Sequence, residues 1–122
     1  MSTDADLDSL EWRSECPISS GLDVLGDRWS LLIVRDLFSH GTRTYSEFLE
    51  SPERVSTNIL AARLRLLTAV GIIERTNPDG AARKNAYRLT RSGEALRPVL
   101  EDLARWSQVH LKAIHPEIVD IV

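Results

Sequence analysis

The middle of the sequence contains two helix-start signals in close succession, and their spacing constrains the fold more than any other feature. Thr44 followed by Glu47 forms a capping-box pattern, which predicts a short helix that the Ser-Pro pair at 51–52 ends. Ser56 then has the chemistry of an N-cap for a longer helix over residues 57–69. A short helix, a tight turn and a longer capped helix are the spacing of a helix-turn-helix.

After this helix the pattern changes from helical to alternating. Residues 72–76 and 85–90 have the composition of two strands, and the turn-rich stretch 77–80 lies between them. The sequence therefore predicts a β-hairpin with a basic tip directly after the helix-turn-helix. This combination is a winged helix, so the expected fold class is mainly α with one small β-hairpin.

Helical patterns also precede the motif. Pro17 opens a helix whose inner face we expect to carry Leu22 and Leu25, and Asp27 can cap the helix that follows. Residues 7–15 predict a shorter amphipathic turn. The domain organisation that we expect is an acidic arm over residues 1–15, a winged helix-turn-helix domain with flanking helices over 16–112, and a tail over 113–122.

Charge is divided unevenly along the 122-residue chain, whose net charge is −3. Residues 42–97 carry ten basic and six acidic side chains, a net charge of +4, whereas the flanks carry five basic and twelve acidic side chains, a net charge of −7. A basic centre between acidic ends suits a module that contacts phosphate with its centre. The sequence thus predicts double-stranded DNA as a partner.

The longer helix has one polar arc and one leucine-rich arc. Because its leucines recur at helical spacing, we expect the opposite arc to enter the major groove. Asn58 and Arg65 can bond base edges, Ala61 and Ala62 permit close approach, and phosphate can meet the helix start. The predicted contacts of this recognition helix, residues 56–69, are Ser56, Thr57, Asn58, Ala61, Ala62 and Arg65.

A second set of residues is expected to contact the DNA backbone. These residues lie in the wing, residues 77–86, and at the starts of the two helices of the motif: Arg83, Lys84, Asn85, Arg43 and Arg54. Arg63 is different because the helical wheel places it inside the apolar arc. We expect Arg63 to be structural and to meet a carboxylate or helix-end carbonyls.

Several short motifs follow one another in the order of a known family. They are Cys-Pro at 16–17, LDVLGDRW at 22–29, Ser56 with Leu60 and RLR at 63–65, GIIER at 71–75, YRLT at 87–90 with Gly93, and Leu96 with PVL at 98–100. Through the order and spacing of these motifs, the chain resembles the HxlR family of bacterial transcription regulators. The resemblance implies a winged-helix homodimer, joined through its N-terminal and C-terminal helices, that binds a palindromic operator. The turn at 51–55 and the wing at 82–86 depart from the family pattern.

The last helix, which begins after Thr90 and which Pro98 is expected to bend, independently suggests a dimer. It carries more apolar surface than one small core can absorb, and we expect this surface to serve both the core and a dimer interface. The residues assigned to the interface are Leu100, Leu103, Trp106 and Leu111.

Cys16 precedes Pro17 at a helix start, where unpaired amides favour the thiolate. The resemblance implies a role in sensing oxidants or electrophiles, whereas the neighbouring Glu15 and the acidic arm favour an inert thiol. A single cysteine excludes an internal disulfide and a cysteine-based zinc site. We expect no metal and no cofactor, and a small-molecule effector stays open.

Two other classes of function compete with a regulator: an enzyme and a protein-interaction module. An enzyme would use Cys16 as nucleophile with His40, His110 or His115 as base, but the chain has no glycine-rich phosphate loop and no metal-spaced histidine pair. A winged helix used only for protein contacts would lack salt-dependent DNA affinity. The short apolar stretches and the acidic N-terminus predict a cytoplasmic protein without a membrane span or signal peptide.

Overall fold

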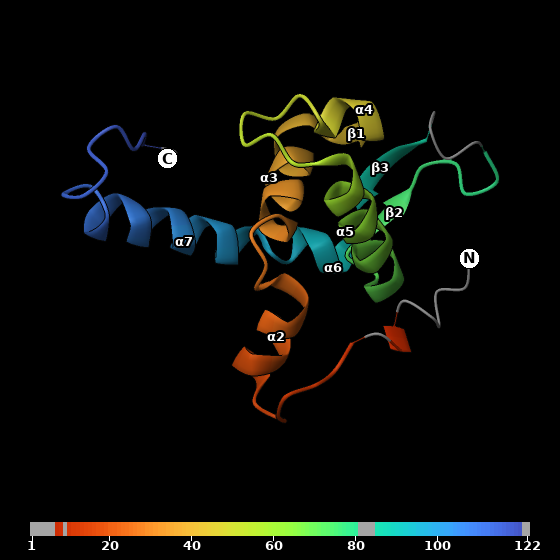
Figure 1. Ribbon diagram of the computed structural model, residues 1–122, viewed down its shortest axis with the longest axis horizontal. Helices are drawn as coiled ribbons and strands as arrows, with labels where there is room; N and C mark the ends of the chain where they lie inside the picture. The colour runs from red at the N-terminus through yellow and green to blue at the C-terminus, as the bar shows by residue number, and fades with distance from the viewer. Residues whose placement is uncertain (1–6, 9, 81–84, 121–122) are drawn as a thin grey trace.

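The computed structural model describes residues 7–8, 10–80 and 85–120. Helices pack against a small antiparallel sheet that lies to one side of the molecule, which confirms the predicted fold class (Figure 1). The elements are α2 (Pro17–Leu25), α3 (Ser30–His40), β1 (Thr42–Thr44), α4 (Tyr45–Phe48), α5 (Thr57–Val70), β2 (Ile73–Arg75), β3 (Ala86–Leu89), α6 (Arg91–Glu94) and α7 (Arg97–His110). Among the described residues, no helix is long and apolar enough to cross a bilayer.

The predicted caps define both helices of the motif. The Thr44 hydroxyl accepts a hydrogen bond from the Glu47 amide at 3.3 Å, and the Glu47 carboxylate accepts one from the Thr44 amide at 2.9 Å. Ser56 caps α5 by accepting from the Ile59 amide at 3.3 Å. Gly71 ends α5 in the left-handed conformation, with φ of 90°, which a side chain would disfavour.

The sheet has one strand more than the sequence predicts. Its order is β1-β3-β2, with Thr42 opposite Arg88 and Ile73 opposite Leu89. Strand β1 has only three residues, which is too short for an alternating pattern to be recognised. It adds an edge to the predicted hairpin and joins the helix-turn-helix to the wing.

One hydrophobic core lies where α3, α4, α5 and β2 meet. Its largest fully buried side chains are Phe48, Leu37, Leu60, Leu67, Ile73 and Val34. One expectation about apolar side chains is wrong, because Leu22, expected on the inner face of α2, is 53% exposed. Of the apolar side chains in residues 7–15, Leu10 packs against the core.

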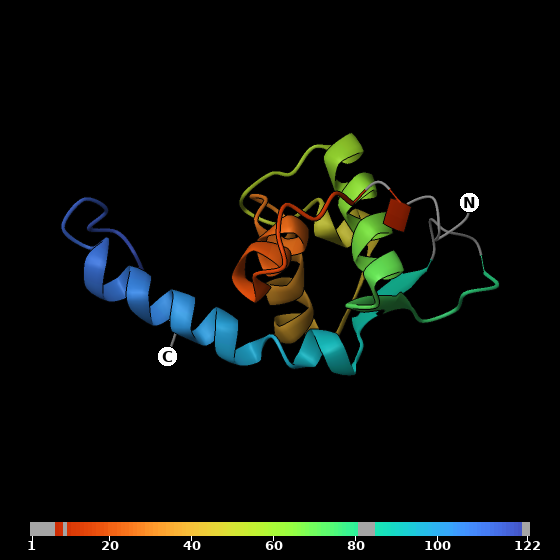
Figure 2. The same cartoon turned by 90° about the horizontal axis from the view of Figure 1, so that it is seen from below.

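The predicted C-terminal helix is two helices. Thr90 caps α6, the helix breaks at Ala95 and Leu96, and α7 restarts with Pro98 in its first turn, where the missing amide hydrogen is tolerated. Gly93 lies so close to β2 that an added Cβ would be 2.2 Å from the Ile72 carbonyl oxygen. Helix α7 extends away from the body of the molecule (Figure 2), and none of its residues is buried.

Candidate nucleic-acid interface

Helix α5 has one buried side and one exposed side. Leu60, Leu64 and Leu67 are buried with Leu66, whereas Ser56, Thr57, Asn58 and Arg65 are exposed and Ala61 and Ala62 are half-buried. Ile59 is 43% exposed. The helix therefore presents hydrogen-bonding side chains and small residues on one side, a surface suited to approach the edges of bases.

Sequence reasoning missed a contact that fixes the start of α5. The Tyr45 hydroxyl, on α4, donates a hydrogen bond to the Thr57 carbonyl at 3.0 Å. This bond links the two helices of the motif. An aromatic residue directly after the Thr44 cap was the available signal, but no local pattern tells which carbonyl its hydroxyl reaches.

Arg63 has the structural partner that the helical wheel predicts. Its guanidinium lies 3.3 Å from the Asp27 carboxylate. Asp27 also accepts hydrogen bonds from the amides of Trp29 and Ser30, at 2.9 and 3.0 Å, and from the Ser30 hydroxyl. Burial alone would raise the pKa of Asp27, but these hydrogen bonds and Arg63 hold it below its ordinary value. The pair ties α5 to the α2–α3 turn.

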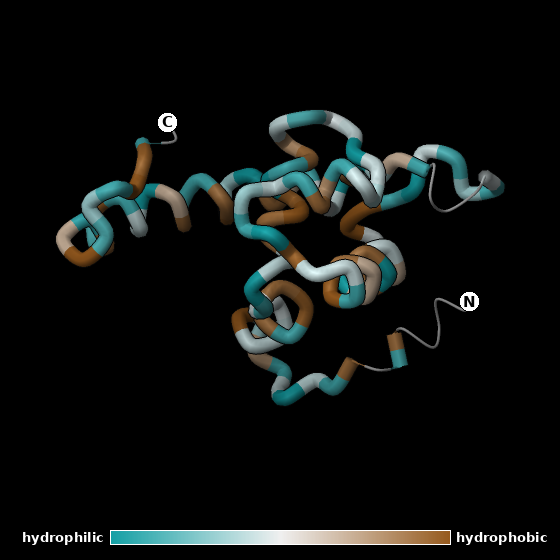
Figure 3. Tube along the Cα trace, turned by 45° about the horizontal axis from the view of Figure 1, so that its top comes forward, coloured by the Kyte–Doolittle hydropathy of each residue, from teal (hydrophilic) through white to brown (hydrophobic). Residues whose placement is uncertain are grey.

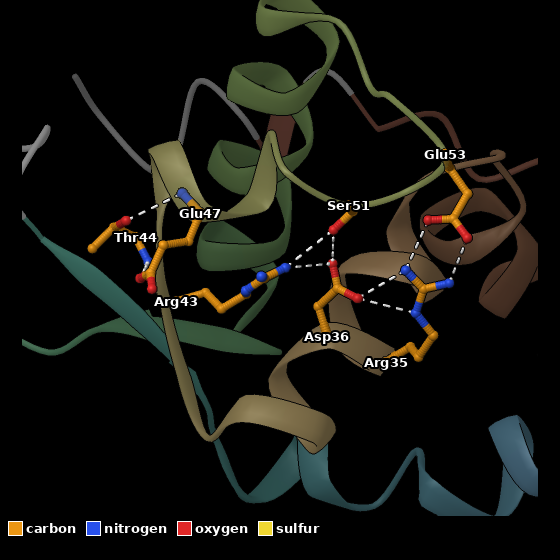
Figure 4. A network of polar contacts seen from close by, with 7 residues as sticks. All are labelled: Arg35, Asp36, Arg43, Thr44, Glu47, Ser51 and Glu53. Carbon is orange, nitrogen blue, oxygen red and sulfur yellow. Dashed lines mark hydrogen bonds and ion pairs between the residues drawn. The ribbon is translucent and has the colours of Figure 1, made fainter.

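Arg43, expected to contact phosphate, instead belongs to a polar network inside the motif (Figure 4). Its guanidinium lies 3.3 Å from Asp36 and donates to the Ser51 hydroxyl at 3.1 Å, and its side chain is only 12% exposed. A guanidinium engaged in this way is not available to DNA. The expectation for Arg43 is wrong because the short strand β1 turns this side chain toward α3.

Asn85 requires a similar correction. It is 3% exposed, its amide oxygen accepts from the Asn77 amide at 2.9 Å, and its amide nitrogen donates to the Asn77 carbonyl. Asn85 therefore closes the base of the wing instead of facing solvent. The other two wing residues of the prediction, Arg83 and Lys84, lie outside the described residues.

Arg54, the remaining predicted backbone contact, lies exposed in the turn between α4 and α5. Its φ is 59°, and it is the one non-glycine residue of the described chain with a positive φ. A side chain in this left-handed conformation costs about 1–2 kcal/mol. Such strain at an exposed turn is a reason to look for a function there.

Cys16 is exposed and occupies the N-cap position of α2, where its side chain caps no amide. Within the described chain it makes no hydrogen bond to a histidine, and His110 packs against Trp106 with ring centroids 5.5 Å apart. The described residues also contain no group of three His, Cys, Asp or Glu side chains that could hold a metal ion. The geometry gives no support to a cysteine–histidine catalytic pair.

Known sequences resemble this chain over most of its length. An uncharacterised HTH-type transcriptional regulator of Synechocystis sp. is 38% identical over 85 residues, which cover 70% of this chain and 62% of the relative. The HTH-type transcriptional regulator YodB of Bacillus subtilis is 33% identical over 93 residues, covering 75% of this chain and 82% of YodB. The chain spans 58–62% of the length of the first curated relatives that it matches.

Solved structures agree with these sequence matches. Reduced YodB superposes with a TM-score of 0.65 at 32% identity, over 80% of this chain and 95% of YodB. The redox regulator HypR in its reduced form superposes with a TM-score of 0.71 at 25% identity, over 83% of this chain and 99% of HypR. The family model of the HxlR-like helix-turn-helix matches residues 24–115. Since that match covers well over half of the sequence, the chain belongs to the HxlR-like helix-turn-helix family.

Proposed function

We propose that the protein is a dimeric transcription regulator that reads a two-fold symmetric DNA operator with α5 and contacts the backbone with its wing. The observation that carries the proposal is the exposed polar side of α5, with Asn58 and Arg65 on a helix whose opposite side is buried in the core. The net charge of +4 over residues 42–97 favours a polyanionic partner. The relatives named as HTH-type regulators support the same function.

The dimer is proposed from the apolar surface of α7. Leu103 and Trp106 are half exposed and Val109 is 72% exposed, while Leu100 and Leu111 are partly covered. Figure 3 shows hydrophobic residues recurring along this projecting helix. A second copy of the chain, whose exposed Ile18 and Leu22 on α2 are also apolar, would remove these side chains from water.

The sequence specificity of α5 is tested with a duplex selected from a random-sequence library by the wild-type protein. Asn58→Ala should weaken binding to this duplex by roughly 5- to 30-fold, because the lost amide can pair with a base edge. Binding to a scrambled duplex of equal length and composition should change little. Titrations at several salt concentrations measure both affinities, and wild-type affinity for the selected duplex should fall steeply with salt.

Lys84→Ala is the contrasting variant, because we assign Lys84 a sequence-independent contact with phosphate. It should weaken both duplexes alike and reduce the salt slope by about two, because each copy of the proposed dimer loses one phosphate contact. Equal losses on both duplexes for Asn58→Ala would refute the base-reading role. A wild-type protein that enriches no sequence and shows no salt-dependent affinity would instead favour a winged helix used for protein contacts.

We further propose that oxidation of Cys16 regulates DNA binding, since the chain is similar to HypR, a redox regulator, and to YodB, whose diamide-treated form has been solved. In this step the Cys16 thiols of two copies form a disulfide, and the N=N bond of diamide accepts the two hydrogens. Diamide should change the operator affinity of the wild type, and a thiol reductant should restore it. Cys16→Ser should not respond, and identical responses of the two proteins would exclude Cys16 from regulation.

A further inference from the structure

The turn of the helix-turn-helix is anchored to α3 by a continuous set of charged side chains (Figure 4). Arg35 donates two hydrogen bonds to the two carboxylate oxygens of Glu53, at 2.7 and 2.9 Å. The same guanidinium donates to one oxygen of Asp36 at 3.0 and 2.8 Å. The other oxygen of Asp36 accepts from Arg43 and from Ser51. Both Ser51 and Glu53, which flank Pro52 in the turn, are thereby connected to one helix.

The geometry of this network is highly constrained. The two-pronged contact between Arg35 and Glu53 fixes distance and orientation together, which a single hydrogen bond does not. The Asp36 and Arg43 side chains are about nine-tenths buried, so solvent screens their interaction little. Consistent with the contact, the hydrogen bonds from Arg35 lower the pKa of Glu53. The network can therefore hold the turn in one conformation.

Arg54, whose backbone is strained, directly follows the anchored Glu53. Arg54, with its φ of 59°, is placed between Glu53, which Arg35 holds, and Val55, which packs against the core. A turn free to relax would bring Arg54 back to negative φ and change the direction in which the chain enters Ser56 and α5. The anchors on both sides of Arg54 prevent that relaxation.

We propose that Arg35 and Glu53 are positioning residues for DNA recognition, which set the direction of α5 and hold Arg54 in its left-handed conformation without touching DNA themselves. This inference rests on the proposed function. The side chains of Arg35 and Glu53 are each about one-third exposed, and ion pairs of this exposure contribute little to stability. Removing the pair should thus disturb DNA recognition much more than folding.

The experiment compares Arg35→Met, Glu53→Met and the double variant on the duplex selected by the wild type and on the scrambled duplex. Glu53→Met is the decisive variant, because it removes a negative charge near the proposed interface. Electrostatics alone would then strengthen binding, whereas loss of positioning should weaken binding to the selected duplex by about tenfold. Arg35→Met should lose at least as much, because it also removes the two hydrogen bonds from Arg35 to Asp36. The double variant should lose no more than Arg35→Met, since that single variant already breaks the link to Glu53.

Arg88→Met is the matched control, because Arg88 forms an exposed ion pair with Glu74 between β3 and β2 and the variant changes the net charge as Arg35→Met does. It should retain affinity within about twofold. Arg35→Lys, which keeps the charge but not the two-pronged contact, should restore only part of the affinity. Denaturant unfolding establishes that each variant is folded under the assay conditions.

Unchanged or tighter binding of the selected duplex by Glu53→Met would overturn the positioning role, as would additive losses in the double variant. If the wild type selects no duplex, the proposed function fails and the positioning role fails with it. If the wild type selects a duplex but the Arg35 and Glu53 variants give one of these overturning results, the regulator function stands and the inference about Arg35 and Glu53 is wrong.

Discussion

Trp106→Glu should convert the protein into a monomer and lower its affinity for the selected two-fold symmetric duplex by more than about a hundredfold. Trp106 is 54% exposed on α7 beside Leu103, and the proposed dimer buries both side chains. A carboxylate placed there would lose its hydration without gaining a partner. Each copy would then bind its half-site alone. Sedimentation velocity measures the oligomeric state, and a salt-matched titration measures the affinity.

Glu101→Gln is the control for this prediction, because Glu101 is exposed on the same helix about 140° away from Trp106. This variant should remain a dimer with the operator affinity of the wild type. A Trp106→Glu protein that sediments as a dimer and binds as tightly as the wild type would show that the apolar face of α7 does not join two copies.

Asp27→Ala should lower the free energy of unfolding by about 2–3 kcal/mol. The carboxylate that it removes accepts two amide hydrogen bonds and one hydroxyl hydrogen bond at the start of α3, and it faces Arg63 on α5. Without it, these donors are left partly buried without their acceptor. Denaturant unfolding at a fixed protein concentration measures the loss, and Asp23→Ala provides a comparison in which an exposed arginine loses its carboxylate.

The Asp27 carboxylate should make the free energy of unfolding depend on pH. The pKa of Asp27 is lowered in the folded protein, so the folded state favours the charged carboxylate. This stabilisation is complete above the unfolded-state pKa and is lost as the pH falls through the folded-state pKa. Acidification from pH 5 to about pH 3 should therefore destabilise the wild type more than Asp27→Asn, whose side chain does not titrate. Equal slopes for the two proteins would contradict this assignment.

Local chemistry made much of the fold predictable. The caps at Thr44, Ser56 and Gly71 act within one helical turn, so their partners lie a few residues away in the sequence and the boundaries of α5 follow from them. Arg63 could be assigned to a structural role because a charged residue inside an apolar arc needs a partner. The identity of that partner, Asp27, depends on how α5 packs against the α2–α3 turn and was not predictable.

The wrong predictions concern side chains whose surroundings are set by tertiary contacts. Arg43 and Asn85 have the composition of DNA contacts, but β1 turns one toward Asp36 and the closure of the wing buries the other. The period of α2 places Leu22 on an apolar face, yet none of the residues that the structure describes covers that face enough to bury Leu22. A helical wheel identifies which residues share a side, and it does not say whether the same chain or a second copy packs there.

The break between α6 and α7 is short and held on both sides. Gly93 lies against the carbonyl of Ile72, directly before β2, and the Arg97 guanidinium stacks over the Phe38 ring of α3 at 4.3 Å. The start of α7 is therefore fixed to the same domain core that carries α5. A change in how two copies meet along α7 would be transmitted as a rigid rotation of each body and would alter the distance between the two recognition helices. In the dimer that we propose, this connection would let an event at the interface change the fit to DNA without any rearrangement inside the domain.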